Sequence, residues 1–119
     1  MFEEYRKISG IYCFENKING KKYIGKSVDL RKRILDHVNS LRRNNDECVM
    51  LQNAWNKYGE NNFEIRVIEI VSDISNIESR EIYYIEKEKS KKPHGYNLTD
   101  GGEGTSGKIV TGNLEEKCQ

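Results

Sequence analysis

The pattern of hydrophobic and polar residues predicts three strands. Residues 8–15 and 22–26 are rich in β-forming side chains, and Asn19-Gly20 between them predicts a hairpin with a type I′ turn. The two segments should therefore pair antiparallel, which can bring Tyr12 and Tyr23 together if the register permits. Residues 63–71 alternate at first and then become fully apolar, which is typical of a central strand.

Apolar residues at helical spacing predict three helices. The first follows a capping residue, Ser27 or Asp29, and runs to about residue 43. The second spans about residues 47–57 and ends near Gly59, a typical C-terminal cap. The third spans about residues 76–88, ahead of Pro93.

Four side chains with polar groups indicate a chemical role: Tyr12 and Tyr23 of the first two strands, and Arg33 and His37 of the first helix. Arg33 and His37 are four residues apart, so their Cβ atoms lie roughly 6 Å apart on one helix face, at the border of the apolar stripe. Two phenols beside a cation and an imidazole are unusual in a core, but they suit a site that cuts a phosphodiester. Lys26 follows the second strand and either contacts a phosphate or is an ordinary solvated lysine.

A carboxylate interrupts the apolar stripe of the third helix. Glu81 lies four residues from Ile77 and four from Ile85, so it must be desolvated or paired. A glutamate at the edge of the stripe that extends to solvent is the alternative. We favour a ligand role, and one carboxylate completed by water and phosphate oxygens suits Mg²⁺.

Composition and length set the class of protein. The 119 residues predict one domain with a tail: residues 1–98 form the domain, and the glycine-rich residues 99–119 a flexible linker or tail. No apolar run reaches the ~18 residues of a membrane span, and the acidic N-terminus lacks a signal-peptide core, so we expect a cytoplasmic protein. The three cysteines are far apart with no C-x-x-C pair, which gives no zinc site.

Charge is distributed unevenly along the chain. The formal net charge is +1, which argues against a general polyanion binder. Residues 17–43, however, hold nine lysines and arginines against two aspartates. This segment therefore either offers a basic face to a nucleic acid or is a solvated hairpin and helix.

Five short motifs together resemble the GIY-YIG nuclease family. They are Gly10-Ile11-Tyr12, Tyr23-Ile24-Gly25, the series Ser27, Leu30, Arg33 and His37, then Glu78-Ser79-Arg80-Glu81, and Gly95-Tyr96-Asn97. The resemblance covers about residues 9–102. Residues 51–59 and the Tyr-Asn-Leu-Thr-x-Gly-Gly ending are most similar to phage- and intron-encoded homing endonucleases.

The resemblance implies an α+β fold, a small three-stranded antiparallel sheet flanked by helices. It implies a DNA endonuclease that leaves 5′-phosphate and 3′-hydroxyl ends, with one Mg²⁺, or Mn²⁺, per site on Glu81. It also implies that a DNA-binding region follows a linker in relatives. A catalytically silent nucleic-acid-binding module and an excision-repair incision nuclease remain alternatives. We expect a monomer in solution, with duplex cleavage by two nicks or by a transient dimer on DNA.

The same resemblance suggests roles for the other site residues. Arg33 would stabilise charge at phosphorus, and Tyr12 would be the general base with His37 lowering its pKa or relaying its proton. Tyr23 would bind the phosphate or orient the water, and which tyrosine is the base stays open. Asn97 either contacts substrate or ties the last segment to the sheet. Homing relatives often carry a histidine before the second helix where this chain has Asp46, so no role is assigned to Asp46.

Overall fold

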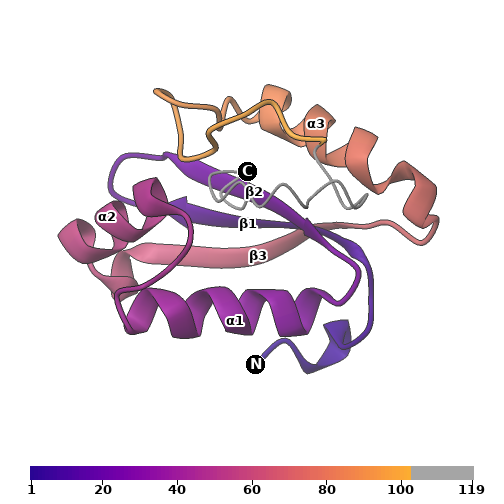
Figure 1. Cartoon of the computed structure of the whole chain (residues 1–119), viewed down its shortest axis with the longest axis horizontal. Coiled ribbons are helices and arrows are strands. Elements are labelled where there is room, and N and C mark those ends of the chain that lie inside the picture. The colour runs from indigo at the N-terminus through magenta and orange to yellow at the C-terminus, as the bar shows by residue number, and fades with distance from the viewer. Residues whose placement is uncertain (103–119) are drawn as a thin grey trace.

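The computed structural model describes residues 1–102 and has three layers, with one small sheet between two layers of helices (Figure 1). The strands and helices follow in the order β1 (Gly10–Asn16), β2 (Lys22–Ser27), α1 (Leu30–Arg42), α2 (Val49–Tyr58), β3 (Phe63–Ile70) and α3 (Ile77–Lys87). Short 3₁₀ turns precede β1, β3 and α3. Both strand pairings are antiparallel, which confirms the predicted α+β class with a three-stranded antiparallel sheet.

The order of strands in the sheet is β2-β1-β3, so the prediction that residues 63–71 form the central strand is wrong. β3 is an edge strand, most of its residues are only partly buried, and Ile70 is 55% exposed. β1 is central because it pairs with β2 along one edge and with β3 along the other, and all but one of its residues are buried. Its short sequence, with Tyr12 and Cys13 between apolar residues, does not reveal that burial.

The connection between β1 and β2 also differs from the predicted type I′ turn. A type I′ turn needs positive φ at both central residues, but only Gly20, with φ 78°, has it in this loop. The strands are joined by the five residues 17–21, where Gly20 N–H donates to Asn16 O (2.7 Å) and Lys21 N–H donates to Asn19 Oδ1 (2.9 Å). Because Ile18 N–H also donates to Asn16 Oδ1 (2.9 Å), two asparagine side chains satisfy backbone groups in this wider loop.

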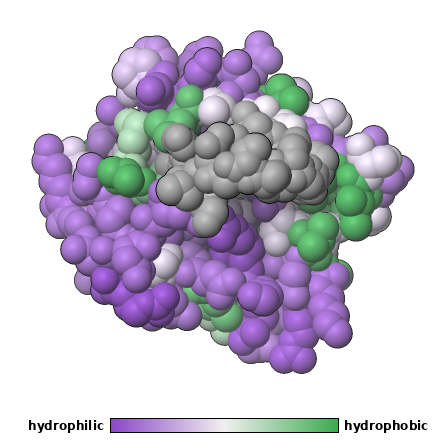
Figure 2. Space-filling view, in the orientation of Figure 1, coloured by the Kyte–Doolittle hydropathy of each residue, from purple (hydrophilic) through white to green (hydrophobic). Residues whose placement is uncertain are grey.

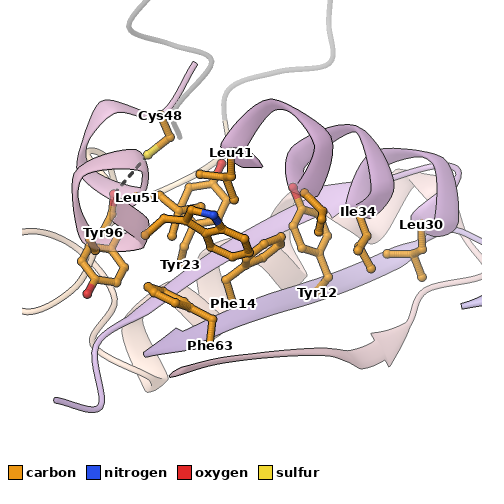
Figure 3. Close-up of a cluster of buried hydrophobic side chains, with 13 residues drawn as sticks. Tyr12, Phe14, Tyr23, Leu30, Ile34, Leu41, Cys48, Leu51, Phe63 and Tyr96 are labelled. Atoms are coloured by element: carbon orange, nitrogen blue, oxygen red, sulfur yellow. Dashed lines mark hydrogen bonds between the residues drawn. The ribbon is translucent and has the colours of Figure 1, made fainter. Parts of the chain in front are cut away.

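Helices cover the two faces of the sheet separately. α1 and α2 lie on one face, and α3 lies on the other (Figure 1). Tyr12, Phe14 and Tyr23 belong to the core cluster of the α1 face (Figure 3), whereas Ile11, Cys13 and Ile24 pack with residues of α3. The period-two alternation within β1 and within β2 therefore directs Tyr12 and Tyr23, one from each strand, toward α1.

Helix α1 places its polar residues by helical spacing. Asp29 is its N-cap, and the Asp29 carboxylate accepts from Lys32 N–H (3.2 Å). Of the two predicted capping residues, Ser27 and Asp29, the structure therefore has Asp29 at this position. His37 lies within the buried face of α1 together with Leu30, Ile34, Val38 and Leu41. The His37 ring is thereby directed at the sheet.

The surface outside the core is largely hydrophilic. Figure 2 shows small, separate hydrophobic patches on one face. No helix within residues 1–102 has the length and apolarity needed to cross a bilayer.

Candidate functional site

The register of β1 and β2 brings the two motif tyrosines together. Tyr12 lies opposite Gly25 and Phe14 lies opposite Tyr23, so the tyrosines are diagonal neighbours with ring centroids 6.5 Å apart. A Cβ atom on Gly25 would lie 2.8 Å from Tyr12 Cε1 and closer still to the hydroxyl. Glycine at position 25 therefore makes the space that the end of the Tyr12 side chain occupies.

His37 packs against both tyrosines from α1. Its ring centroid lies 5.4 Å from that of Tyr23 and 6.0 Å from that of Tyr12, and the residue is 1% exposed. Phe14 is the third aromatic neighbour, at 5.5 Å. The predicted grouping of two phenols and one imidazole is thus present as a buried cluster.

Arg33, one turn before His37, is the accessible member of the group. Its Nη2 donates to Glu47 Oε2 at 2.6 Å, and its side chain is 33% exposed. Arg33 also lines a surface pocket of about 470 Å³ together with Ser40, Asp46 and Glu47. A phosphate group could therefore approach the guanidinium from solvent, in competition with the Glu47 carboxylate.

Burial controls the acidity of the two phenols. It raises the pKa of Tyr12 to about 12, although the charge of Arg33 and a hydrogen bond from it act in the opposite direction. Burial, followed by the proximity of Tyr12, raises the pKa of Tyr23 well above its usual value. Neither phenol is ionised at neutral pH in this state, so a tyrosine that removes a proton from water must pass its own proton onward.

Asp46 is a site residue that the sequence did not reveal. It comes from the segment between α1 and α2, and its Oδ1 is hydrogen-bonded to His37 Nδ1 at 2.9 Å with both side chains buried. Burial alone would raise the pKa of Asp46, but hydrogen bonds from His37, Ser40 and Cys48 N–H outweigh it and lower the pKa. The group is therefore a carboxylate that accepts hydrogen bonds.

Glu47, the next residue, is a second site residue that the sequence did not reveal. It joins the site through Arg33, and Asp46 joins it through His37, so two adjacent acids contact the two motif residues of α1. The one available signal was a pair of acids directly after a helix break. Such a pair predicts surface charge unless the path of the loop is known.

Glu81 is buried, as its place in the apolar stripe predicted. The residue is 0% exposed, and its Oε1 accepts from Lys26 Nζ (3.0 Å) and from Gly102 N–H (3.0 Å). α3 covers the other face of the sheet from α1, yet the negative charge of Glu81 raises the pKa of both Tyr12 and Tyr23. Glu81 therefore contributes, after burial, to the electrostatics of the tyrosine cluster, and its 0% exposure shows that it does not point into bulk solvent.

The donor atoms at Glu81 fit a hard divalent cation. No group of three or more histidine, cysteine, aspartate or glutamate side chains suited to a metal ion occurs within residues 1–102. Mg²⁺ needs only one or two protein carboxylates, because water and substrate phosphates complete its coordination. A single glutamate fits that pattern and does not resemble the clustered ligands of a zinc site, whereas the Lys26 ammonium at Oε1 competes with a cation for the carboxylate.

Lys26 and Asn97 are both engaged within the protein. The Lys26 side chain is 8% exposed in its ion pair with Glu81, so it is not the solvated lysine of the alternative interpretation. The Asn97 amide donates to Ile24 O (2.9 Å) and accepts from Ile24 N–H (2.9 Å) and Ser90 Oγ (2.6 Å), and the residue is 0% exposed. These contacts support the tie to the sheet for Asn97 over a contact with substrate.

The end of the described chain reaches this region. Gly101 and Gly102 have φ values of 95° and 86°, and an added Cβ on Gly101 would lie 2.8 Å from Ile85 Cδ1. Glycines therefore allow the backbone to approach α3. The predicted boundary at residue 98 stays a prediction, because residues 103–119 of the predicted linker lie outside the described residues.

Known proteins share both the sequence and the geometry. The chain is 38% identical over 93 residues to Intron-associated endonuclease 1 of Enterobacteria phage T4, an alignment that covers 77% of this chain and 37% of that protein. It is 37% identical over 54 residues to Probable intron-encoded endonuclease 1 of Neurospora crassa, which covers 45% of this chain and 16% of that protein. The chain thus spans well under half of the length of these relatives.

Solved structures match over nearly their whole length. A variant of the catalytic domain of intron endonuclease I-TevI superposes with a TM-score of 0.72 at 33% identity, covering 82% of this chain and 99% of that one. A second structure, of the catalytic domain of homing endonuclease I-TevI, gives a TM-score of 0.70 at 33% identity. The family model of the GIY-YIG catalytic domain matches residues 8–97. With the motif tyrosines, Arg33, His37 and Glu81 all inside this match, the chain belongs to the GIY-YIG catalytic domain family.

Proposed function

We propose that this chain is the catalytic domain of a homing-type DNA endonuclease, which hydrolyses one phosphodiester per site with the help of Mg²⁺. The products would carry a 5′-phosphate and a 3′-hydroxyl. The observation that carries the proposal is the buried cluster of Tyr12, Tyr23 and His37, which has Arg33 at its accessible edge and Glu81 within electrostatic reach. Its family supports this activity, since the matched relatives are named endonucleases.

Arg33 is proposed to bind the scissile phosphate. It is partly exposed beside a pocket, and its charge is permanent, so it stabilises the additional negative charge of the transition state. Replacing one such group typically lowers the rate by about 10²- to 10³-fold. A phosphate that binds there must displace or share the Glu47 carboxylate, which now accepts from Arg33 Nη2.

The tyrosines and His37 are proposed to move the proton of the attacking water. One phenol orients the water and takes its proton, and the other holds a phosphate oxygen. Because burial raises the pKa of Tyr12 to about 12, the phenol needs a base to receive its own proton. The His37 ring, packed against both tyrosines, is the nearest imidazole.

Glu81 is proposed to hold the divalent cation. When bound there, Mg²⁺ polarises the phosphate and stabilises the departing 3′ oxygen, and Mn²⁺ would do the same. The Lys26 ammonium shares Glu81 Oε1, so binding of a cation requires the lysine to move aside or to turn to the phosphate.

The partner and setting follow from the same proposal. The substrate would be duplex DNA, cut by two successive nicks or by two copies that meet on it, with the free protein a monomer. Because the chain spans 37% of the T4 relative, target recognition would fall to a region beyond this domain. The relative is phage-encoded, which supports the cytoplasm of an infected cell as the place of action.

Nicking of supercoiled plasmid tests the proposal. Wild-type protein, Arg33→Ala and Glu81→Ala would be compared in Mg²⁺ and in EDTA. We expect the wild type to nick in Mg²⁺ alone, and both variants to lose at least about 10²-fold in rate. Plasmid binding without nicking in Mg²⁺ or Mn²⁺ would instead favour a silent binding module, and a Glu81→Ala variant that nicks normally would remove the metal assignment.

A further inference from the structure

Asp46 is buried beside His37, and nothing in the family resemblance assigns it a role. We propose that Asp46 is a positioning residue that holds the hydrogen of His37 on Nδ1 and thereby keeps Nε2 as the proton acceptor for the tyrosine pair. This inference rests on the proposed nuclease function. It gives this chain a carboxylate–imidazole–phenol relay in which Asp46 never touches the substrate.

The Asp46 carboxylate is fixed on both of its oxygens. Oδ1 lies 2.9 Å from His37 Nδ1 and accepts from Ser40 Oγ, and Oδ2 accepts from Cys48 N–H at 2.9 Å. The backbone N–H of Asp46 donates to Gln52 Oε1 at 2.9 Å. A carboxylate with this set of donors cannot give a hydrogen to His37, so Nδ1 must carry one.

The other ring nitrogen of His37 is buried without a partner. Nε2 makes no hydrogen bond to any of residues 1–102. An unsatisfied buried polar atom costs roughly 1–3 kcal/mol, so its presence calls for an explanation. Three aromatic side chains surround the ring, and of these Tyr12 and Tyr23 carry a hydroxyl. In the neutral imidazole with its hydrogen on Nδ1, Nε2 carries a lone pair that can accept a proton, and the ring lies next to two phenols.

The proton transfers balance. The O–H bond of the attacking water breaks as a new O–H bond forms on the phenol oxygen, while the phenol's own proton moves to His37 Nε2. The water oxygen bonds to phosphorus, the bond from phosphorus to the 3′ oxygen breaks, and that oxygen takes a proton from solvent. The ring becomes an imidazolium next to the Asp46 carboxylate, which offsets the new positive charge in the buried site.

The wild-type protein provides the first test without any substitution. The chain has two histidines, His37 and His94, so ¹⁵N labelling of histidine gives two resolvable rings. We expect His37, in its neutral form, to show a protonated Nδ1 and an unprotonated Nε2. A His37 ring with its hydrogen on Nε2 would overturn the proposal, whatever the variants do.

Asp46→Asn provides the second test, because the carboxamide has one oxygen and one NH₂ group. Cys48 N–H can only donate, so the amide oxygen should stay on that side and turn the NH₂ toward His37 Nδ1. The hydrogen of the ring then moves to Nε2. We expect this tautomer change to lower kcat by about 10²-fold or more with KM nearly unchanged, as loss of the orienting carboxylate does in other relays.

Ser40→Ala is the matched control. It removes a different hydrogen bond to the same Oδ1 and leaves the pair of His37 and Asp46 in place. We expect it to retain the wild-type tautomer and a rate within about threefold. A changed tautomer at full rate in Asp46→Asn, or a slow Asp46→Asn with the wild-type tautomer, would refute the relay. If Arg33→Ala nicks normally, the proposed function itself falls, while the ¹⁵N measurement still decides the geometry.

Discussion

The ion pair of Lys26 and Glu81 gives a prediction that separates stability from catalysis. The two charged atoms lie 3.0 Å apart, with side chains that are 8% and 0% exposed. At an effective dielectric constant of about 20 the attraction at this distance is roughly 5 kcal/mol, and desolvation offsets much of it. Removal of one partner leaves the other charge buried without its opposite charge at 3.0 Å, which should cost about 3–5 kcal/mol.

The perturbation is a double-mutant cycle of Lys26→Met, Glu81→Gln and the combined variant. Each single substitution should lower the free energy of unfolding, measured by urea denaturation, by about 3–5 kcal/mol. The double variant has no unpaired charge, so it should return to within about 1–2 kcal/mol of the wild type. Mg²⁺-dependent plasmid nicking should nevertheless remain lost in the double variant, because the carboxylate is gone.

Two results would refute this reasoning. A double variant that nicks at the wild-type rate would show that Glu81 serves the fold alone. A coupling energy below about 0.5 kcal/mol would show that the two charges are solvated in solution.

Three further predictions concern the surrounding residues. Because the folded-state pKa of Tyr12 is about 12 against 10.0 for an ordinary tyrosine, the unfolded chain loses that proton first, and stability should fall as pH rises from 10 to 12. Over that range Tyr12→Phe should lose roughly 2–3 kcal/mol less than the wild type in urea titrations, and equal losses would contradict the burial of the phenol. Asn97→Ala leaves the backbone groups of Ile24 unpaired, so it should lose roughly 3 kcal/mol of stability. The DNA affinity of its folded fraction should stay the same, and a marked loss of affinity would restore the predicted substrate contact. Glu47→Gln removes the competitor for Arg33 and should tighten DNA binding by up to about fivefold, the equivalent of one partly exposed ion pair. Weaker binding would show that Glu47 chiefly orients Arg33.

The sequence was sufficient for the elements that depend on local pattern. The apolar stripe of α1 and the spacing of Arg33 and His37 predicted a shared helix face, and the structure confirms it. The place of Glu81 between Ile77 and Ile85 predicted a buried carboxylate for the same reason. Helical and strand periodicity state which side chains share a face, and those statements need no tertiary information.

The sequence was insufficient for features that depend on the path of a loop or on the order of strands in the sheet. The apolar run of β3 indicated a central strand, but centrality depends on which strands have neighbours on both sides. Asp46 reaches His37 because the segment between α1 and α2 turns back over α1, and its closing contact with Gln52 forms only once α2 has docked. Nine residues of sequence separation carry no signal for such a contact.

The end groups of the cut strand test the central claim most directly. Plasmid nicked by the wild-type protein in Mg²⁺ would be treated with DNA ligase, which seals nicks that carry a 5′-phosphate and a 3′-hydroxyl. We predict that the wild-type nicks are sealed to closed circles and that Arg33→Ala produces at least about 10²-fold fewer of them. Nicks that ligase cannot seal would contradict cleavage of the bond to the 3′ oxygen, and nicks formed equally by wild type and Arg33→Ala would contradict hydrolysis at this site.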